Sequence, residues 1–275
     1  MLLRHDNALF PHSAYLQPFT GASTLRSRLR RLVPSPSVNL SFDRSMARIK
    51  AELASFRPAE EIVVLVVGGG LQRSALDAAL GAGGRVRTVY SDIDVHADAD
   101  LFCDGHDLPF QDGSIDVVIT TAVLEHVLHP EQAVAEMRRV LRVGGLVYSE
   151  VPFMIQVHEG AYDFTRYTHS GHRRLFNGFR EIDSGMVAGP ATALVWTIEY
   201  FVLSFLSRQS FRLAAKVLVR TLFFWIKYLD LLLKNKPEAY DAAACTYFLG
   251  ARIEGRIDDA AIISGYIGGQ RVRHV

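Results

Sequence analysis

The 275-residue sequence has few features of a specialised class of protein. Its two cysteines, Cys103 and Cys245, lie far apart without metal-ligand spacing, so neither a disulfide framework nor a structural zinc site is expected. Its 30 basic and 29 acidic residues nearly balance, which gives no reason to expect a nucleic-acid partner. The first residues lack the charged start, apolar run and cleavage site of a secretory signal. We therefore expect a cytoplasmic protein without a bound metal ion.

The sequence does contain a regular alternation of strand-like and helix-like segments. Residues 62–67 (IVVLVV) form a short β-branched run of the kind that a parallel sheet buries on both faces. Further patterns follow along the chain, with strands at 86–90, 115–119 and 146–148 and helices at 43–56, 71–80 and 130–141. A Gly144-Gly145 turn is expected to end the last of these helices before the strand at 146–148. This alternation predicts an α/β protein with a doubly wound, mostly parallel sheet.

Polar and glycine residues follow the first two strands of this pattern. Gly68, Gly69 and Gly70 come directly after the first strand, where a ligand-binding turn must approach its ligand without a Cβ in the way. An ordinary tight turn is the alternative. Arg73 stands where the third glycine of a dinucleotide-binding motif belongs, which disfavours a nicotinamide-dependent oxidoreductase. Asp92 ends the second strand, where a carboxylate can accept both hydroxyls of a ribose.

An ordered string of motifs follows Asp92. Asp104 precedes 108–110 (LPF), 112–118 (DGSIDVV) leads into a strand, and 123–127 (VLEHV) comes after it. Over roughly residues 62–153, this string resembles the class I S-adenosylmethionine-dependent methyltransferases. Within them it is most similar to the methyltransferase type 11 family, which includes the ubiquinone and menaquinone biosynthetic methylases. The resemblance implies a seven-stranded sheet and S-adenosylmethionine as cofactor.

The resemblance also assigns roles to single residues. Gly68, Gly69 and Gly70 would line the methionine part of the cofactor, and Asp92 would bind the ribose. The implied adenine contacts are Asp104, Gly105, Leu108 and Phe110. Thr120 and Thr121, at the end of the fourth strand, would flank the sulfonium and the incoming nucleophile.

Two residues depart from the family pattern. Val66 stands where the first motif usually has an acidic residue, and Gln72 where its third glycine is usual. The lost carboxylate removes an expected contact to the methionine end of the cofactor. The alternative to an enzyme is therefore a catalytically inactive, methyltransferase-like binding or regulatory subunit.

Candidate groups for the acceptor side lie in two clusters. Methyl transfer to an oxygen needs a positioned acceptor and a group that takes its proton, and His126 or His158, with Glu125, could serve. A structural role for Glu125 and His126 is the alternative. Residues 158–169 resemble a string in methyltransferases of sugar and cell-envelope clusters, which implies a substrate wall of Glu159, Tyr162, Asp163, Arg166 and Tyr167. Asp163 and Arg166 could instead form an ion pair that fixes the loop.

The last part of the chain predicts an interrupted strand pair. A helix pattern at 168–177 and strand patterns at 180–187 and 243–253 leave a helical insertion between the last two strands. We divide the chain into an N-terminal extension with a leading helix, the methyltransferase core, the insertion, and the last strand with its tail, at 1–58, 59–187, 188–240 and 241–275.

The insertion combines basic and aromatic residues at helical spacing. Between 204 and 236 it has seven basic residues and one acidic residue, Asp230. A basic, aromatic-rich amphipathic helix is typical of a segment that lies in a membrane interface, and the apolar runs are short for spanning a bilayer. We therefore expect residues 190–236 to bind an anionic membrane at the cytoplasmic leaflet, and the acceptor to be a small or lipid-linked glycan or quinone-like molecule. A helical pair with a solvated basic stripe and a homodimer interface are the alternatives.

Overall fold

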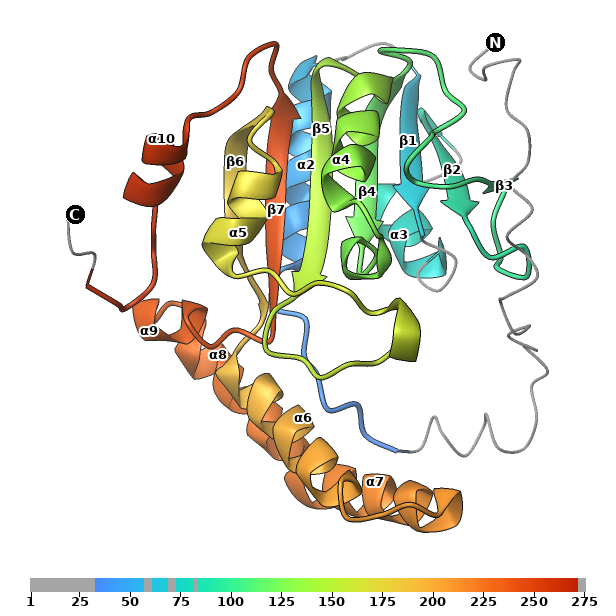
Figure 1. The fold of residues 1–275 in the computed structure, drawn as a ribbon. Coiled ribbons are helices and arrows are strands. Elements are labelled where there is room, and N and C mark those ends of the chain that lie inside the picture. The colour runs from blue at the N-terminus through green and yellow to red at the C-terminus, as the bar shows by residue number, and fades with distance from the viewer. Residues whose placement is uncertain (1–32, 57–60, 69–72, 82–83, 272–275) are drawn as a thin grey trace.

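The computed structural model of the protein describes residues 33–56, 61–68, 73–81 and 84–271. Among these residues, seven strands form one sheet in the order β3-β2-β1-β4-β5-β7-β6 (Figure 1). β7 is antiparallel to β5 and β6, and the other pairings are parallel. The strands are β1 Ile62–Val67, β2 Val86–Asp92, β3 Leu101–Phe102, β4 Ile115–Thr121, β5 Leu141–Pro152, β6 Phe179–Ala188 and β7 Cys245–Arg252. This is the predicted class I methyltransferase fold, and the prediction of a mostly parallel seven-stranded sheet is confirmed.

Helices cover both faces of the sheet. α4 (Pro130–Val140) and α5 (His169–Leu175) pack on one face, and α2 (Phe42–Phe56) and α3 (Arg73–Leu80) pack on the other. Alternate residues of β1 enter the two cores, because successive side chains of a strand point to opposite faces. Both faces of β1 are therefore apolar, as the β-branched run predicted.

One predicted boundary is wrong. We expected the helix after Pro130 to end at a Gly144-Gly145 turn, but α4 ends at Val140 and β5 begins at Leu141. Gly144, with φ of 80°, lies inside β5 at a register shift against β4. The residues between Leu141 and Leu146 form a bulge, and β5 pairs with β4 both before and after this bulge.

The predicted insertion lies between β6 and β7. It contains α6 (Pro190–Leu203), α7 (Gln209–Phe223), η4 (Phe224–Leu229), α8 (Asp230–Leu233) and α9 (Pro237–Tyr240). In Figure 1, α6 and α7 form an arm that extends away from the sheet, beyond the end where the parallel strands finish. In the described part of the chain, no helix is long and apolar enough to cross a membrane.

The basic stripe of the insertion is only partly solvated. Arg220 binds the fully buried carboxylate of Glu199, with Nε 2.6 Å from Oε2. Arg212 donates to the carbonyls of Leu203 and Leu206 at the end of α6. Lys227, 8% exposed, donates to the Ser35 carbonyl. These three cations bind acceptors within the protein, because a buried carboxylate, the carbonyls at a helix end and a loop carbonyl all need hydrogen-bond donors.

A buried histidine joins α5 to the sheet and predicts an acid-sensitive fold. His172 is fully buried, with Nε2 3.0 Å from Ser149 Oγ and Nδ1 3.1 Å from Thr246 Oγ1. Burial lowers the pKa of His172 to about 3, and that of the buried His169 to about 4. The unfolded chain then binds more protons below pH 6.5, so the free energy of unfolding should fall as pH drops from 6.5 towards 3, by up to about 1.4 kcal/mol per pH unit for each histidine.

Urea denaturation of the wild type and of His172→Gln between pH 7 and pH 5 measures this effect. Carboxyls with ordinary pKa values stay ionised over that interval. Glu125, with its raised pKa, opposes the effect of the histidines but is common to both proteins, so the difference between the two slopes reports His172. We expect the free energy of unfolding to fall less steeply with decreasing pH in His172→Gln. Equal slopes for the two proteins would show that His172 does not carry the acid sensitivity.

Candidate active site

The carboxyl ends of β1 and β2 form a corner around Gly68. Val67 pairs with Ser91, so Gly68 lies beside Asp92, and the Gly68 amide donates to the Ser91 carbonyl at 2.8 Å. Gly68 has φ of +71°, and a Cβ there would lie 2.4 Å from Val123 Cγ2. Only glycine fits both the conformation and the space. The predicted Gly69 and Gly70, and the departure at Gln72, lie outside the described residues.

Asp92 ends β2 at this corner, as the sequence predicted. Its Oδ1 accepts from the Asp94 amide at 3.0 Å. Burial raises the pKa of Asp92, and the amides of Asp94 and Ile93 oppose the rise. The carboxylate is thus half-buried and fixed by its own loop.

The residues predicted around adenine separate into two groups. Asp104 lies on the surface beside the corner and binds the ring of His106, with Nδ1 2.6 Å from Oδ1. A Cβ on Gly105 would lie 3.8 Å from Val67 Cγ1, which places Gly105 at the end of β1. Leu108 and Phe110 are 0% and 2% exposed and belong to the core beneath α4. Those two side chains present no surface to a ligand in this structure.

β4 brings two threonines to the same edge of the sheet. Thr120 pairs with Val67 of β1, and its buried Oγ1 has no hydrogen-bond partner in the described part of the protein. Thr121 is 6% exposed. The next residue, Ala122, has φ of 55°, the one described non-glycine residue with positive φ. Such strained backbone concentrates at functional sites, and here it turns the chain sharply into η2 (Leu124–His126).

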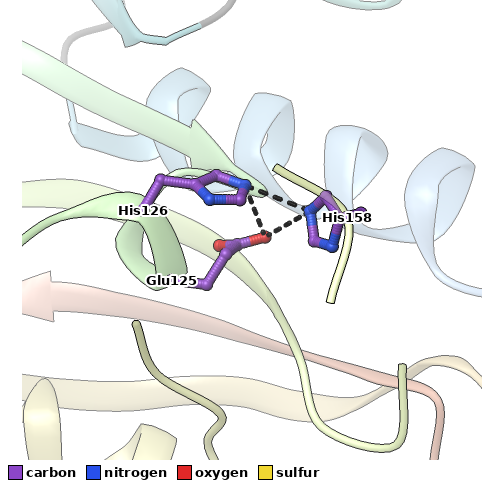
Figure 2. Close-up of side chains that lie close together, drawn as sticks. All are labelled: Glu125, His126 and His158. Carbon is purple, nitrogen blue, oxygen red and sulfur yellow. Dashed lines mark hydrogen bonds and ion pairs between the residues drawn. The ribbon is translucent and has the colours of Figure 1, made fainter. Parts of the chain in front are cut away.

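η2 and the loop after β5 bring together the three predicted catalytic residues, which we call the Glu125 cluster (Figure 2). Nε2 of His126 lies 3.1 Å from Nε2 of His158, although the two residues are 32 positions apart. Oε1 of Glu125 lies 3.8 Å from each of these nitrogens. Glu125 is 0% exposed, and burial raises the pKa of its carboxyl to about 7.

An ion pair holds the loop that carries His158. Asp163 binds the guanidinium of Arg166 and accepts from the His158 amide at 3.0 Å, and Arg166 holds the pKa of Asp163 down at about 2. Arg166 also donates to the Ile155 carbonyl at 2.9 Å. The Phe164 amide donates to the Glu125 carbonyl at 2.8 Å. These contacts fix the loop against η2, which is the alternative that the sequence left open for Asp163 and Arg166.

The other predicted substrate residues differ in exposure. Tyr162, 47% exposed, and Glu159 lie on the surface of the loop. Tyr167 packs against the core under α4, and burial raises its pKa to about 12. Its hydroxyl is buried without a hydrogen-bond partner among the described residues.

A polar group near the end of β5, Glu150, was not predicted from the sequence. Glu150 accepts from the Tyr148 hydroxyl at 2.6 Å, and the Asn39 side chain lies 3.5 Å away. Burial raises the pKa of Glu150. A polar residue near the end of a parallel strand is the signal that could have found it.

Comparison with known proteins finds matches to part of the chain. Residues 67–149 match the family model described as a methyltransferase domain. The chain is 36% identical over 113 residues to an uncharacterised 37.1 kDa protein of transposon TN4556 from Streptomyces fradiae, covering 37% of this chain and 33% of that protein. It is 47% identical over 47 residues to the ubiquinone/menaquinone biosynthesis C-methyltransferase of Burkholderia mallei, covering 17% of this chain and 19% of the relative. The matched segments therefore span a third or less of these relatives.

The similar solved structures have low sequence identity to this chain. One is a Haemonchus contortus phosphoethanolamine N-methyltransferase, determined with phosphomonomethylethanolamine and S-adenosylhomocysteine. It is 16% identical, with a TM-score of 0.45, over 76% of this chain and 53% of that one. The chain therefore carries a methyltransferase domain, and its seven-stranded sheet has the strand arrangement predicted for the class I fold.

Proposed function

We propose that this protein transfers a methyl group from S-adenosylmethionine to an oxygen of a small or lipid-linked acceptor, such as a glycan or a quinone-like molecule. The observation that carries the proposal is that one edge of the sheet holds both the Gly68–Asp92 corner and the Glu125 cluster. Ligands of open α/β sheets bind beyond the carboxyl ends of the strands. A cofactor at the corner and an acceptor at the cluster would then lie side by side.

The cofactor half of the proposal uses residues already at this edge. Gly68, with Gly69 and Gly70 next in the sequence, would hold the methionine part, and Asp92 would accept hydrogen bonds from the ribose hydroxyls. Asp104 and Gly105 would face the adenine, while Thr120 and Thr121 would lie beside the sulfonium. When bound, the cofactor supplies an activated methyl group, and the protein contributes mainly the alignment of the acceptor with it.

The acceptor half depends on the Glu125 cluster. An oxygen nucleophile must lose its proton, and His126, His158 and Glu125 are the polar groups gathered where that oxygen would lie. The Asp163–Arg166 pair positions His158, and the exposed Tyr162 and Glu159 would border the acceptor.

Titration of the protein with S-adenosylhomocysteine in a calorimeter tests the cofactor site. We expect binding of one ligand per chain. No heat of binding at millimolar ligand would favour the second candidate, a catalytically inactive methyltransferase-like subunit. That candidate is motivated by Val66, which is fully buried in the core beside α2 and α3, where the family usually has a carboxylate.

The insertion supports an amphiphilic acceptor delivered at a membrane. The end of α6, the start of α7 and the turn between them form the surface that we call the arm tip, which exposes 64% of Phe201, 74% of Phe205 and 56% of Phe211. The exposed Arg208 lies in the same turn. Large exposed apolar patches mark interaction surfaces, and aromatic residues with cations favour the interface of an anionic bilayer. We propose that the arm tip binds the membrane that carries the acceptor.

A further inference from the structure

The two histidines of the Glu125 cluster face each other through atoms that both carry lone pairs. Nδ1 of His126 lies 2.8 Å from the Tyr162 carbonyl oxygen, and Nδ1 of His158 lies 3.4 Å from the Gln156 carbonyl oxygen. A carbonyl oxygen only accepts, so the 2.8 Å contact assigns the ring hydrogen of His126 to Nδ1. The Gln156 carbonyl and the Asp163 carboxylate, each 3.4 Å from Nδ1 of His158, favour the same tautomer there. A neutral imidazole then has a lone pair on Nε2, and the two Nε2 atoms are 3.1 Å apart. Such an arrangement is repulsive unless a cation lies between them.

The carboxylate of Glu125 completes this cluster. It is 0% exposed, and neither oxygen accepts a hydrogen bond from another residue in the described part of the chain. A buried carboxylate without a partner is strongly unfavourable, and buried charges normally pair or coordinate a metal ion. One carboxylate oxygen and the two histidine nitrogens all lie within 4.8 Å of one another.

We propose that Glu125, His126 and His158 bind one divalent transition-metal ion of the zinc type. Two histidine nitrogens bound to tetrahedral zinc, with Zn–N bonds of about 2.0–2.1 Å, lie about 3.3 Å apart. The 3.1 Å between the two Nε2 atoms fits this spacing, and a small rotation of the Glu125 side chain brings its oxygen into range. Two histidines and one carboxylate leave a coordination position open, as in catalytic zinc sites.

The hydrogen-bond partners of the second ring nitrogen of each histidine are those expected around a metal site. Histidines that bind a metal usually donate their second N–H to a backbone carbonyl or a carboxylate, which fixes the ring. His126 does so with the Tyr162 carbonyl. His158 has the Gln156 carbonyl and Oδ2 of Asp163, each 3.4 Å from Nδ1. Arg166 in turn binds Asp163, so the ion pair of the loop is a positioning element for His158.

A shared proton between the two imidazoles is the competing explanation. It would relieve the contact between the nitrogens but leave both Glu125 oxygens without a hydrogen bond from any other described residue. A metal ion satisfies all three side chains at once. The sequence analysis expected no bound metal ion, because these three ligands do not show a short, regular spacing along the chain. The proposed metal site differs from that expectation. The acceptor hydroxyl would occupy the open position, where the cation would lower its pKa so that its proton passes to solvent water. The three side chains would then act as ligands and not as the base, and this last step rests on the proposed function.

Titration of untagged protein with zinc chloride in a calorimeter tests the proposal. We expect one zinc ion per chain, confirmed by the metal content after dialysis. His126→Ala and His158→Ala should each weaken zinc binding at least 10-fold, because each removes one of three ligands. His129→Ala is the matched control, since His129 is exposed and lies outside the cluster. It should bind zinc like the wild type.

A second variant keeps the test valid if removing a ligand disrupts folding. Asp163→Asn retains the size of the side chain and should weaken zinc binding about 10- to 100-fold through His158. Absence of zinc binding by the wild type, or equal affinities for His126→Ala and His129→Ala, overturns the proposal. S-adenosylhomocysteine binding without zinc binding would leave the methyltransferase function standing. Zinc binding without S-adenosylhomocysteine binding would leave only the metal site.

Discussion

Replacing Asp92 with alanine should weaken the binding of S-adenosylhomocysteine about 100-fold or more. The half-buried carboxylate is already fixed by the Asp94 amide, so it can accept hydrogen bonds from a ribose without reorganising. Hydrogen bonds to a charged group contribute about 1.5–3 kcal/mol each, and about 1.4 kcal/mol corresponds to a tenfold change in affinity. Loss of two such bonds gives the expected factor. Calorimetric titration of wild type and variant measures it.

The matched control for this experiment is Asp98→Asn. Asp98 lies in the same loop, but its side chain is 76% exposed and paired only with Arg73 at the surface. Exposed ion pairs contribute little, so this variant should bind S-adenosylhomocysteine like the wild type. Equal affinities for Asp92→Ala and the wild type would show that the cofactor does not use the carboxylate at the end of β2.

Placing two glutamates at the arm tip should abolish binding to anionic vesicles. Phe201 and Phe205 are neighbours, with ring centroids 5.3 Å apart, and both are largely exposed. Burying such a side chain contributes about 1.5–3 kcal/mol, and a carboxylate in its place is repelled by anionic lipid. Phe201→Glu/Phe205→Glu should therefore lower vesicle binding at least 100-fold in a co-sedimentation assay at low salt.

The control substitution lies at the other end of the sheet. Val143 is 53% exposed near the start of β5, and Val143→Glu adds one charge at a site far from the arm. It should leave vesicle binding unchanged. If the wild-type protein does not co-sediment with anionic vesicles at low salt, the membrane proposal is wrong. Sedimentation velocity then decides the alternative, because a dimer that the arm-tip variant dissociates would assign this surface to a second copy of the chain.

The fold could be predicted from the sequence because its determinants are local. The β-branched run of β1 predicts a strand with two apolar faces, and Asp92 was correctly expected at the end of β2. The two-residue β3 and α10 (Asp259–Ser264) were missed, because such short elements carry too little periodicity to stand out. The glycines inside β5 were misassigned to a turn because a bulge and a turn use the same residues.

The amino-acid sequence alone was enough to recognise the α/β pattern, the methyltransferase motifs and the residue types near the site. The contacts of these residues became visible only in the folded protein. In the folded protein, His126 contacts His158, which is 32 positions away in the sequence. Arg220 points inward and binds the buried carboxylate of Glu199. The reason is that periodicity reports which side chains are apolar, whereas the partner of a charged group depends on chain segments that meet only after folding. Several basic residues of the arm therefore bind groups within the protein, and Glu125, His126 and His158 together form one candidate metal site.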